Sequence, residues 1–383
     1  MSTTWEASSP RVLLLHAYSP KNSGDGLLVE LAKATVLRAL DNADFRVIAS
    51  EASAFEGDEY VQWRDRFLSK STRIPRRAAM LATGFLGPCN EIKELAEQAD
   101  LIVAVGGGYL RGGSIGPAIK SWGAHYGQLK LAARYGHKAI YLSQSIGPFK
   151  GVYKRAVARQ LAKIRTVCVR DDRSLSEFAS VASVLRMPDL AVLELARQPR
   201  PSGVSTPLSD DPVIVARELS RPRRYYELLD EASKSKQFEW ALQSTGGGND
   251  DLPLTQRLGT RTPRPMAEVL ADESPRIVVS TRLHGALSSL IAGFPAIHLS
   301  YERKGWGAYE DIGLDDFVLN ARDATLAQVD ALMQRILGNP DAFWSLIETK
   351  KAEIRSTENY LLDVISSVVN GSQQSATRSW EAS

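Results

Sequence analysis

Short apolar runs alternate with segments of helical apolar spacing along most of the chain. Residues 11–16 form the first run, and turn-forming residues and then a helical pattern over 27–40 follow it. Further strand-like runs recur with stretches long enough for crossover helices between them. Alternation of this kind predicts a parallel sheet covered on both faces. The later runs of this half are 45–49, 101–105, 139–142 and 167–169.

A second α/β pattern follows a Pro- and Ser-rich stretch. It predicts strands at 213–216, 238–243, 276–280 and 296–299, with helices at 224–234 and 283–292. Apolar stripes after residue 326 predict long C-terminal helices, and the polar end predicts a frayed tail. The expected organisation is an N-terminal domain 1–196, a linker 197–211, a C-terminal domain 212–342, a helix 343–370 and a disordered tail 371–383.

Length and composition agree with two α/β domains. At 383 residues the chain exceeds the roughly 250 residues that one core usually serves. With 47 Lys and Arg against 44 Asp and Glu, the net charge of +3 gives no reason to expect a nucleic acid partner. No apolar run reaches the ~18 residues of a spanning helix, and the start lacks a signal peptide, so we expect a cytoplasmic protein. Neither Cys89 nor Cys168 lies in a metal-binding pattern.

Ligands of doubly wound domains bind beyond the carboxyl ends of the strands, so the loops there carry the chemistry. The first is Asn22-Ser-Gly-Asp-Gly26, at the start of the first long helix. Backbone amides at a helix start favour an anion, but the carboxylate of Asp25 would repel a phosphate. Asp25 either caps the helix, or it accepts hydrogen bonds from a sugar hydroxyl and acts as a general base.

Two further loops offer neutral hydrogen-bonding groups. The loop 106–113 holds five glycines, yet it lacks the spacing of a dinucleotide fingerprint. It is either a tight turn or a place where backbone amides face a ligand. The loop that contains Gln144 and Ser145 has small polar side chains suited to binding hydroxyls.

Arginines at strand ends indicate a site for an anion. Arg170 follows one strand directly, where it either pairs with Asp171 or Asp172, or presents its planar guanidinium to a carboxylate or phosphate. Arg282 and His284 follow another strand onto the first turn of a helix. That arrangement predicts an anion site beside a titratable acid or base.

Taken together, these loops resemble the polysaccharide pyruvyl transferase family. The resemblance implies a fold similar to glycosyltransferase B, with two Rossmann-like, doubly wound domains facing a cleft. It also implies transfer of pyruvate from phosphoenolpyruvate to two hydroxyls of a sugar, as a cyclic ketal. The motifs that carry it are Asn22-Ser-Gly-Asp25, Gly106-Gly-Gly108, Gln144-Ser-Ile-Gly-Pro148, Val169-Arg-Asp-Asp-Arg-Ser174, Pro188-Asp-Leu-Ala191, Ser280-Thr-Arg-Leu-His284 and Tyr301-Glu-Arg-Lys304.

The resemblance also implies roles for individual residues. His284 would be the general acid and Asp25 the base for ring closure. No metal and no cofactor is required, and the acceptor is a free, lipid-linked or polymeric sugar. Phosphoenolpyruvate would lie against Arg170, Arg282, Leu283 and Lys304, and the acceptor against Asn22, Gly107, Gly108, Gln144 and Ser145.

Two alternatives to this function follow from the same residues. A glycosyltransferase of the same architecture would use a nucleotide sugar, and a non-catalytic protein would only bind a glycan or an anion. The basic stretch 64–77 belongs to none of the family motifs. It is either a solvated helix face or a surface for peripheral association with an anionic membrane, which would place the protein at the inner face.

Overall fold

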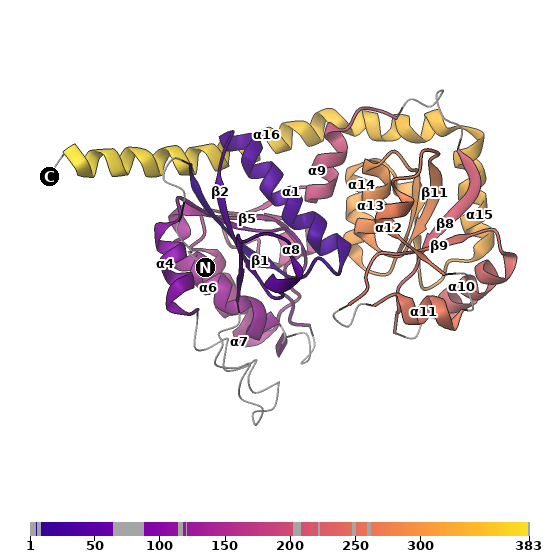
Figure 1. Ribbon diagram of the computed structural model, residues 1–383, viewed down its shortest axis with the longest axis horizontal. Helices are drawn as coiled ribbons and strands as arrows, with labels where there is room; N and C mark the ends of the chain where they lie inside the picture. The colour runs from indigo at the N-terminus through magenta and orange to yellow at the C-terminus, as the bar shows by residue number, and fades with distance from the viewer. Residues whose placement is uncertain are drawn as a thin grey trace. The chain divides into compact units, whose positions relative to one another are not determined.

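The computed structural model describes two compact units. It describes residues 5, 9–63, 88–113, 118–119, 121–201, 208–220, 223–246, 250–258 and 262–381. Unit 1 comprises Met1–Pro20, Asp25–Leu190 and Thr357–Ser383, and unit 2 comprises Lys21–Gly24 and Ala191–Ser356 (Figure 1). The basic stretch 64–77, for which we expected a solvated face or a membrane surface, lies outside the described residues.

Unit 1 is built on a seven-stranded parallel sheet in the order β3-β2-β1-β4-β5-β6-β7. Its strands are β1 (Arg11–Ala17), β2 (Asp44–Ala49), β3 (Tyr60–Gln62), β4 (Leu101–Ala104), β5 (Ala139–Gln144), β6 (Thr166–Val169) and β7 (Val184–Arg186). Its helices are α1 (Ser23–Leu40), α4 (Asn90–Gln98), α6 (Gly127–Arg134), α7 (Gly151–Leu161) and α8 (Asp172–Glu177). Short turns of helix lie at Ala52–Ala54, Trp122–Tyr126 and Gly136–Lys138. The first two residues of α1 belong to unit 2.

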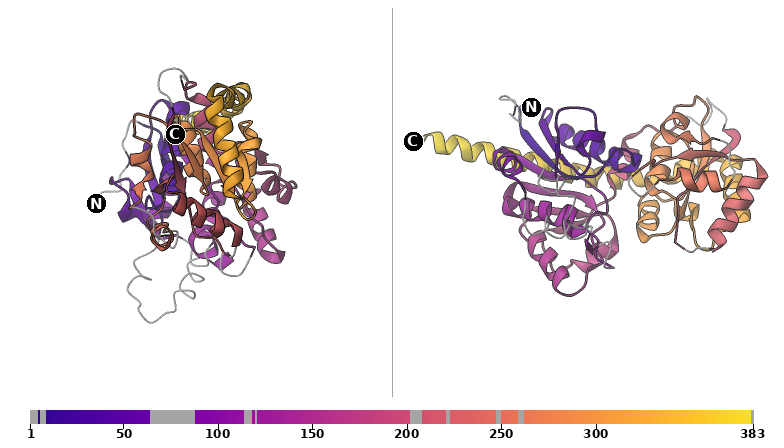
Figure 2. Two further views of the ribbon diagram at one scale, coloured as in Figure 1. Left: turned by 90° about the vertical axis from the view of Figure 1, so that its right-hand side faces the viewer. Right: turned by 60° about the horizontal axis from the view of Figure 1, so that its bottom comes forward.

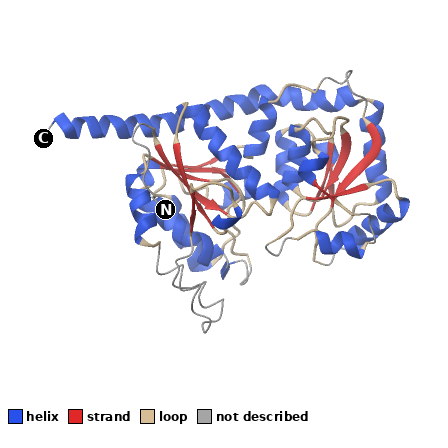
Figure 3. Cartoon of the chain, viewed as in Figure 1, coloured by secondary structure: helices blue, strands red, loops and turns tan. Residues whose placement is uncertain are grey.

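Apolar residues cover both faces of this sheet, as the sequence predicts. Leu13 and Leu15 pack in one core with residues of α4, α6 and α7. The alternating residues Val12 and Leu14 point to the other face and are also fully buried. A parallel sheet buried on both faces needs such continuous apolar strands, and helices surround the sheet in each unit (Figure 3).

Unit 2 repeats the strand order of unit 1 with six parallel strands, β10-β9-β8-β11-β12-β13. They are β8 (Ser209–Val215), β9 (Glu239–Leu242), β10 (Arg264–Pro265), β11 (Arg276–Ser280), β12 (Ala296–Ser300) and β13 (Val318–Asn320). The helices are α9 (Leu190–Arg197), α10 (Arg223–Ser235), α11 (Leu252–Arg257), α12 (Met266–Val269), α13 (Leu283–Ile291), α14 (Arg303–Asp311) and α15 (Leu326–Gly338), with a short turn at Asp315–Phe317. The connections reverse direction between β1 and β4 in unit 1 and between β8 and β11 in unit 2. Figure 2 shows the two units in two further views.

The C-terminal helix is longer than the sequence suggests. α16 (Pro340–Glu381) has 42 residues, and it contributes to unit 2 as far as Ser356 and to unit 1 from Thr357 onward. Residues 371–381, expected to form a disordered tail, are helical in the structure. Only Gly371 in that segment is a poor helix former, and extending an existing helix is far easier than nucleating one. None of the described helices has the length and apolar composition to span a bilayer.

The crossing points between the units differ from the expected domain boundaries. Unit 2 begins at Ala191 rather than after a linker at 197–211, and the last residues of that stretch already belong to β8. The segment Lys21–Gly24, which we call the crossing loop because unit 1 precedes and follows it in the sequence, belongs to unit 2. We expected it in the N-terminal domain. Its backbone pairs with the chain after β9: Ser23 N donates to Gln243 O at 3.1 Å, and Thr245 N donates to Lys21 O at 3.0 Å.

Three histidines away from the candidate site are buried: His16, His125 and His298. His298 contacts the carbonyl oxygen of Ser280 through Nδ1 at 2.8 Å and stacks on Tyr309. Burial lowers the pKa of His125 to about 4 and is the largest cause that lowers the pKa of His298 to about 4. Both imidazoles are therefore neutral at pH 7.

These histidines predict a loss of stability in acid. Between pH 6.5 and 4 the unfolded chain binds protons that the folded chain does not, so the free energy of unfolding falls as pH falls through that window. We expect His298→Gln, which keeps a neutral hydrogen-bonding side chain, to reduce the difference between the urea midpoints at pH 7 and pH 5. The exposed His137 gives the control, because His137→Gln should leave that difference unchanged. An unchanged difference in His298→Gln would contradict the assignment.

Candidate functional site

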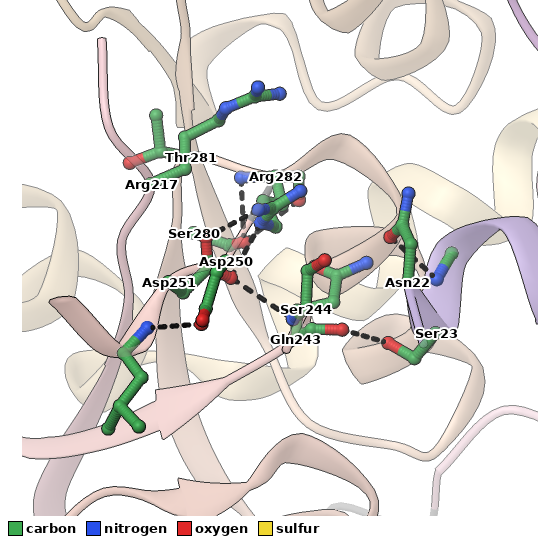
Figure 4. A network of polar contacts seen from close by, with 12 residues as sticks. Asn22, Ser23, Arg217, Gln243, Ser244, Asp250, Asp251, Ser280, Thr281 and Arg282 are labelled. Carbon is green, nitrogen blue, oxygen red and sulfur yellow. Dashed lines mark hydrogen bonds and ion pairs between the residues drawn. The ribbon is translucent and has the colours of Figure 1, made fainter. Parts of the chain in front are cut away.

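Polar side chains of unit 2 gather where its strands end. Arg217 follows β8, Gln243 and Ser244 follow β9, and Arg282 follows β11. β8 and β11 flank the point at which the strand order reverses, which is where doubly wound sheets bind ligands. Figure 4 shows these side chains converging with the crossing loop.

A buried ion pair between Arg282 and Asp251 forms the centre of this site. Arg282 Nε donates to Asp251 Oδ2 at 2.7 Å, and Arg282 Nη2 donates to Asp251 Oδ1. The arginine is 6% exposed and the aspartate fully buried. Burial raises the pKa of Asp251, and the hydrogen bonds and charge of Arg282 act in the opposite direction. The pair fixes the plane of the guanidinium, because two of its N–H groups bind two oxygens of one carboxylate.

Arg217 is a second cation of this site, and the sequence analysis missed it. Its guanidinium donates to the hydroxyl of Tyr301 and lies 5.0 Å from the centre of that ring. Its carbonyl oxygen accepts from Tyr225 at 3.0 Å. The positive charge of Arg217 also lowers the pKa of Asp251, so two guanidinium groups act on one buried carboxylate. The rule that singled out Arg170 and Arg282, an arginine directly after a strand, would have found it.

His284 lies half-buried on the first turn of α13, as predicted. A Cβ atom added to Gly24 would lie 3.0 Å from both Cβ and Nδ1 of His284 and 3.1 Å from Nε2 of Gln243. Only a glycine lets the crossing loop approach the imidazole this closely. Asn22 Oδ1 accepts a hydrogen bond from Gly24 N at 3.3 Å, so Asn22 caps α1. The sequence analysis had considered Asp25 for that role.

The remaining predicted residues of this unit lie in its core and on the first turn of α14, which follows β12. Leu283 is buried, and Lys304 Nζ forms an ion pair with Glu302 at 3.0 Å. Both Lys304 and His284 act on the pKa of His298, although burial is the larger cause. The structure therefore brings Asn22, Arg282, Leu283, His284 and Lys304 together in unit 2.

The other predicted residues belong to unit 1, including Arg170. This arginine is 3% exposed; it donates to Asp189, and its Nε donates to Ser145 Oγ at 3.0 Å. The expected partners of Arg170 are engaged elsewhere: Asp171 accepts from Ser174 N at 2.9 Å and caps α8, and Asp172 pairs with Arg186. Arg170 and Arg282, expected to bind one donor, thus lie in different units.

Gly107 and Gln144 pair in parallel beyond the ends of β4 and β5. Gly107 has φ of +137°, which a residue with a side chain rarely adopts, and Ser145 N donates to Gly107 O at 2.7 Å. The carbonyl oxygen of Gly108 accepts from Arg111 Nε at 2.6 Å. Asp25 also counts with unit 1, so four of the five expected acceptor residues and the expected base lie there, and Asn22 does not.

Several buried polar atoms at these strand ends have no hydrogen-bond partner among the residues that the structure describes. A buried polar group left unsatisfied costs about 1–3 kcal/mol, so native proteins hold few of them. Their concentration at the carboxyl ends of β4, β5 and β9 indicates places where a ligand or water completes the bonding. The atoms are Tyr109 OH, Ser143 Oγ, Gln144 Nε2 and Oε1, Gln243 Oε1 and Ser244 Oγ.

The described residues hold no group of three or more His, Cys, Asp or Glu side chains that could bind a metal ion. Arginine, lysine, histidine and neutral polar groups stand at the carboxyl ends of the strands. In unit 2 these are cations around one imidazole. In unit 1 they are amides and hydroxyls around a neutralised arginine.

Solved structures share the two-domain fold over nearly the whole chain, and the fold is that of glycosyltransferase B. UGT73P12 of Glycyrrhiza uralensis, solved with glycyrrhetinic acid 3-O-monoglucuronide, is 10% identical with a TM-score of 0.52, over 98% of this chain and 99% of that one. Sucrose-phosphate synthase from Thermosynechococcus elongatus is 12% identical with a TM-score of 0.50, over 98% and 100%. At such identities the likeness shows the fold alone.

The sequence defines the family within this fold class. The model of the polysaccharide pyruvyl transferase family matches residues 22–303, and the chain belongs to that family. No curated protein sequence matches the chain. The resemblance seen in the strand-end loops is thereby confirmed, and with it the class of enzyme, a transferase.

The buried pair predicts a large effect of Asp251→Asn on stability. The variant leaves Arg282 buried without its counter-charge, so we expect the free energy of unfolding to fall by about 3–5 kcal/mol, measured by urea denaturation. Asp250→Asn is the matched control: Asp250 is exposed, its Oδ1 accepts from Leu252 N at 3.0 Å, and asparagine can still accept that bond. The control should change stability by no more than about 0.5 kcal/mol. Equal effects of the two variants would show that the pair is not the stabilising interaction.

Proposed function

We propose that this protein transfers pyruvate from phosphoenolpyruvate to two hydroxyls of a glycan sugar, forming a cyclic ketal. The observation that supports it is that His284, Arg282, Arg217 and Lys304 all follow the carboxyl ends of strands of unit 2. Phosphoenolpyruvate carries a carboxylate and a phosphate close together, and it needs several fixed cations. It also needs one group able to protonate its methylene carbon.

His284 is the proposed proton donor in the first step. It gives a proton to the methylene carbon, and the carbon that bears the phosphate becomes cationic. A sugar hydroxyl adds to that carbon and loses its proton, phosphate departs, and the second hydroxyl closes the ring and loses its own. The two hydroxyls release two protons in all. One restores the proton that His284 gave to the methylene carbon, and the other leaves with phosphate.

The arginines and Lys304 stabilise the phosphate as its charge develops. Arg282 is neutralised by Asp251, so it supplies N–H groups in a fixed plane. Arg217 acts on the carboxylate of Asp251 as well. Arg282, Arg217 and Asp251 together therefore keep a net positive charge. The backbone amides at the start of α13 add further donors. Arg170, which the family resemblance also assigns to phosphoenolpyruvate, is neutralised by Asp189 in the same way.

We assign the acceptor to the neutral polar groups of unit 1. Gln144, Ser145 and the backbone at Gly107 and Gly108 provide hydrogen-bond donors and acceptors suited to hydroxyls. Asp25 is the proposed base for ring closure. Asn22 lies instead beside His284 in unit 2 and caps α1 there. Because phosphoenolpyruvate is a metabolite of the cytoplasm, we expect the reaction to take place there.

The alternatives are a nucleotide-sugar glycosyltransferase of the same fold and a non-catalytic glycan- or anion-binding protein. Thermal shift measurements with phosphoenolpyruvate and a panel of nucleotide sugars separate them. The proposal requires stabilisation by phosphoenolpyruvate. Stabilisation by a nucleotide sugar alone would overturn it, and stabilisation by phosphoenolpyruvate with no turnover of any acceptor would favour a binding protein.

We expect His284→Gln to lower the rate of ketal formation by about 10²–10⁴, because glutamine cannot protonate carbon. Binding of phosphoenolpyruvate should remain, since the cations that hold it are unchanged. Product is measured as the mass of pyruvate less one water added to a synthetic glycoside, and binding by thermal shift. If the variant unfolds at a markedly lower temperature than the parent, His284 is a core residue and the assignment fails.

The close approach of the crossing loop gives a more selective test. In Gly24→Ala the new methyl group meets His284 at 3.0 Å, so the imidazole must move, and we expect kcat to fall by about tenfold. Gly26→Ala is the matched control two residues on. Its nearest atom would be Pro20 Cα at 3.4 Å, an ordinary contact, and alanine favours the helix. Equal kcat values in the two variants would show that the position of His284 does not matter.

A further inference from the structure

Tyr109 and Gln144 present buried polar atoms that the fold does not satisfy. Gln144 is fully buried, and neither its Nε2 nor its Oε1 has a hydrogen-bond partner among the described residues. The hydroxyl of Tyr109 is also buried, and it too lacks a partner within the described part of the chain. Three unsatisfied atoms at one edge of a sheet are unusual, because each costs free energy that a partner would recover.

The backbone places these two side chains on the same face of the sheet. Gly107 and Gln144 are partners in a parallel bridge, and bridge partners direct their side chains to the same face of a sheet. A Cβ atom on Gly107 would lie 2.5 Å from the hydroxyl oxygen of Tyr109, so the phenol occupies the place of the missing side chain. The hydroxyl of Tyr109 therefore lies on the face of the sheet to which Gln144 directs its side chain.

A stack of buried rings fixes the phenol. The ring of Tyr109 stacks on His125 at 5.1 Å between centroids and on His16 at 6.2 Å. His16 in turn contacts His125 through their Nδ1 atoms at 3.1 Å and the hydroxyl of Tyr141 through Nε2 at 2.8 Å. His16 has φ of +70°, a strained conformation for a residue other than glycine. Both histidines are buried, and their ring contacts position Tyr109.

The charged groups that act on the phenol carry no excess of positive charge, which indicates the class of ligand. Burial is the largest cause that raises the pKa of Tyr109. The negative charges of Asp25 and Asp189 also raise it, and the positive charge of Arg170 lowers it. Arg170 is neutralised by Asp189 and also donates to Ser145, and burial keeps His16 and His125 neutral. The charged groups that act on the pKa of Tyr109, which are Asp25, Arg170 and Asp189, therefore leave no excess positive charge for a phosphate or carboxylate. An amide and a phenol both donate and accept, as sugar hydroxyls do.

We propose that Tyr109 and Gln144 form a subsite that binds hydroxyl groups of an uncharged sugar ring and thereby selects the acceptor. The assignment of that sugar as acceptor rests on the proposed pyruvyl transfer; the binding of hydroxyls at this place does not. Tyr109 is a specificity residue that the sequence analysis missed. An isolated tyrosine in a glycine-rich loop gives no signal until the loop is folded over the neighbouring strand.

The test uses two variants that remove the unsatisfied atoms and keep the shape, Tyr109→Phe and Gln144→Met. Because the removed atoms have no partner, the unfolding midpoint of the free protein should stay the same or rise. The KM for a glycoside acceptor should rise about tenfold in each variant, the loss of one or two hydrogen bonds to the ligand. The KM for phosphoenolpyruvate should not change. Tyr153→Phe is the control, because its hydroxyl lies 3.2 Å from Ser121 Oγ; it should lose stability with no change in either KM.

Direct binding separates failure of this subsite from failure of the proposed reaction. Methyl glycosides of glucose, galactose and mannose are titrated into the full chain without phosphoenolpyruvate and followed by thermal shift. Stabilisation of the parent by one of them, lost in Tyr109→Phe, supports the subsite even if no ketal forms. Binding of none of the three would overturn it. So would a Tyr109→Phe variant that is less stable and keeps its acceptor KM, since the hydroxyl would then be held by the fold or by a buried water.

Discussion

The buried ion pair between Arg282 and Asp251 is the interaction on which the site of unit 2 depends. Either charge alone in that position would cost several kcal/mol, and together they neutralise each other through two hydrogen bonds. The pair ties the start of α11 to the start of α13. His284, two residues after the arginine, is positioned by the same contact. Structure and chemistry are therefore coupled here: the carboxylate that stabilises the fold is also the one that orients the guanidinium.

Unit 1 uses the same arrangement. Arg170 follows β6 as Arg282 follows β11, and its counter-ion Asp189 also comes from a segment that precedes a helix. Both sheets place their polar groups at the carboxyl ends of parallel strands, where such sheets bind ligands. They differ in what surrounds the pair. Unit 2 adds further cations and an imidazole, whereas unit 1 adds amides and hydroxyls around Gln144, a division that suits an anionic donor and a neutral acceptor.

Much of the fold and part of the site could be predicted from the sequence. The central strands were predictable because a strand buried on both faces must be continuously apolar, whereas the edge strands β3, β7, β10 and β13 are too short and mixed for that signal. Arg170, Arg282 and His284 were found because they follow such strands directly. Asp189 and Asp251 were not assigned roles, since a carboxylate in a loop is ordinarily solvated and nothing local shows that it is buried.

The sequence by itself determined the two doubly wound domains, the family, and which side chains stand at the carboxyl ends of the strands. These follow from periodicity and order along the chain, which are local properties. Only the tertiary structure decided which of those side chains are neutralised, that Lys21–Gly24 belongs to unit 2 beside His284, and that Tyr109 and Gln144 share one face of a sheet. Burial, ion pairing and unsatisfied hydrogen bonds depend on residues that are distant in sequence, and the chain must fold before they meet.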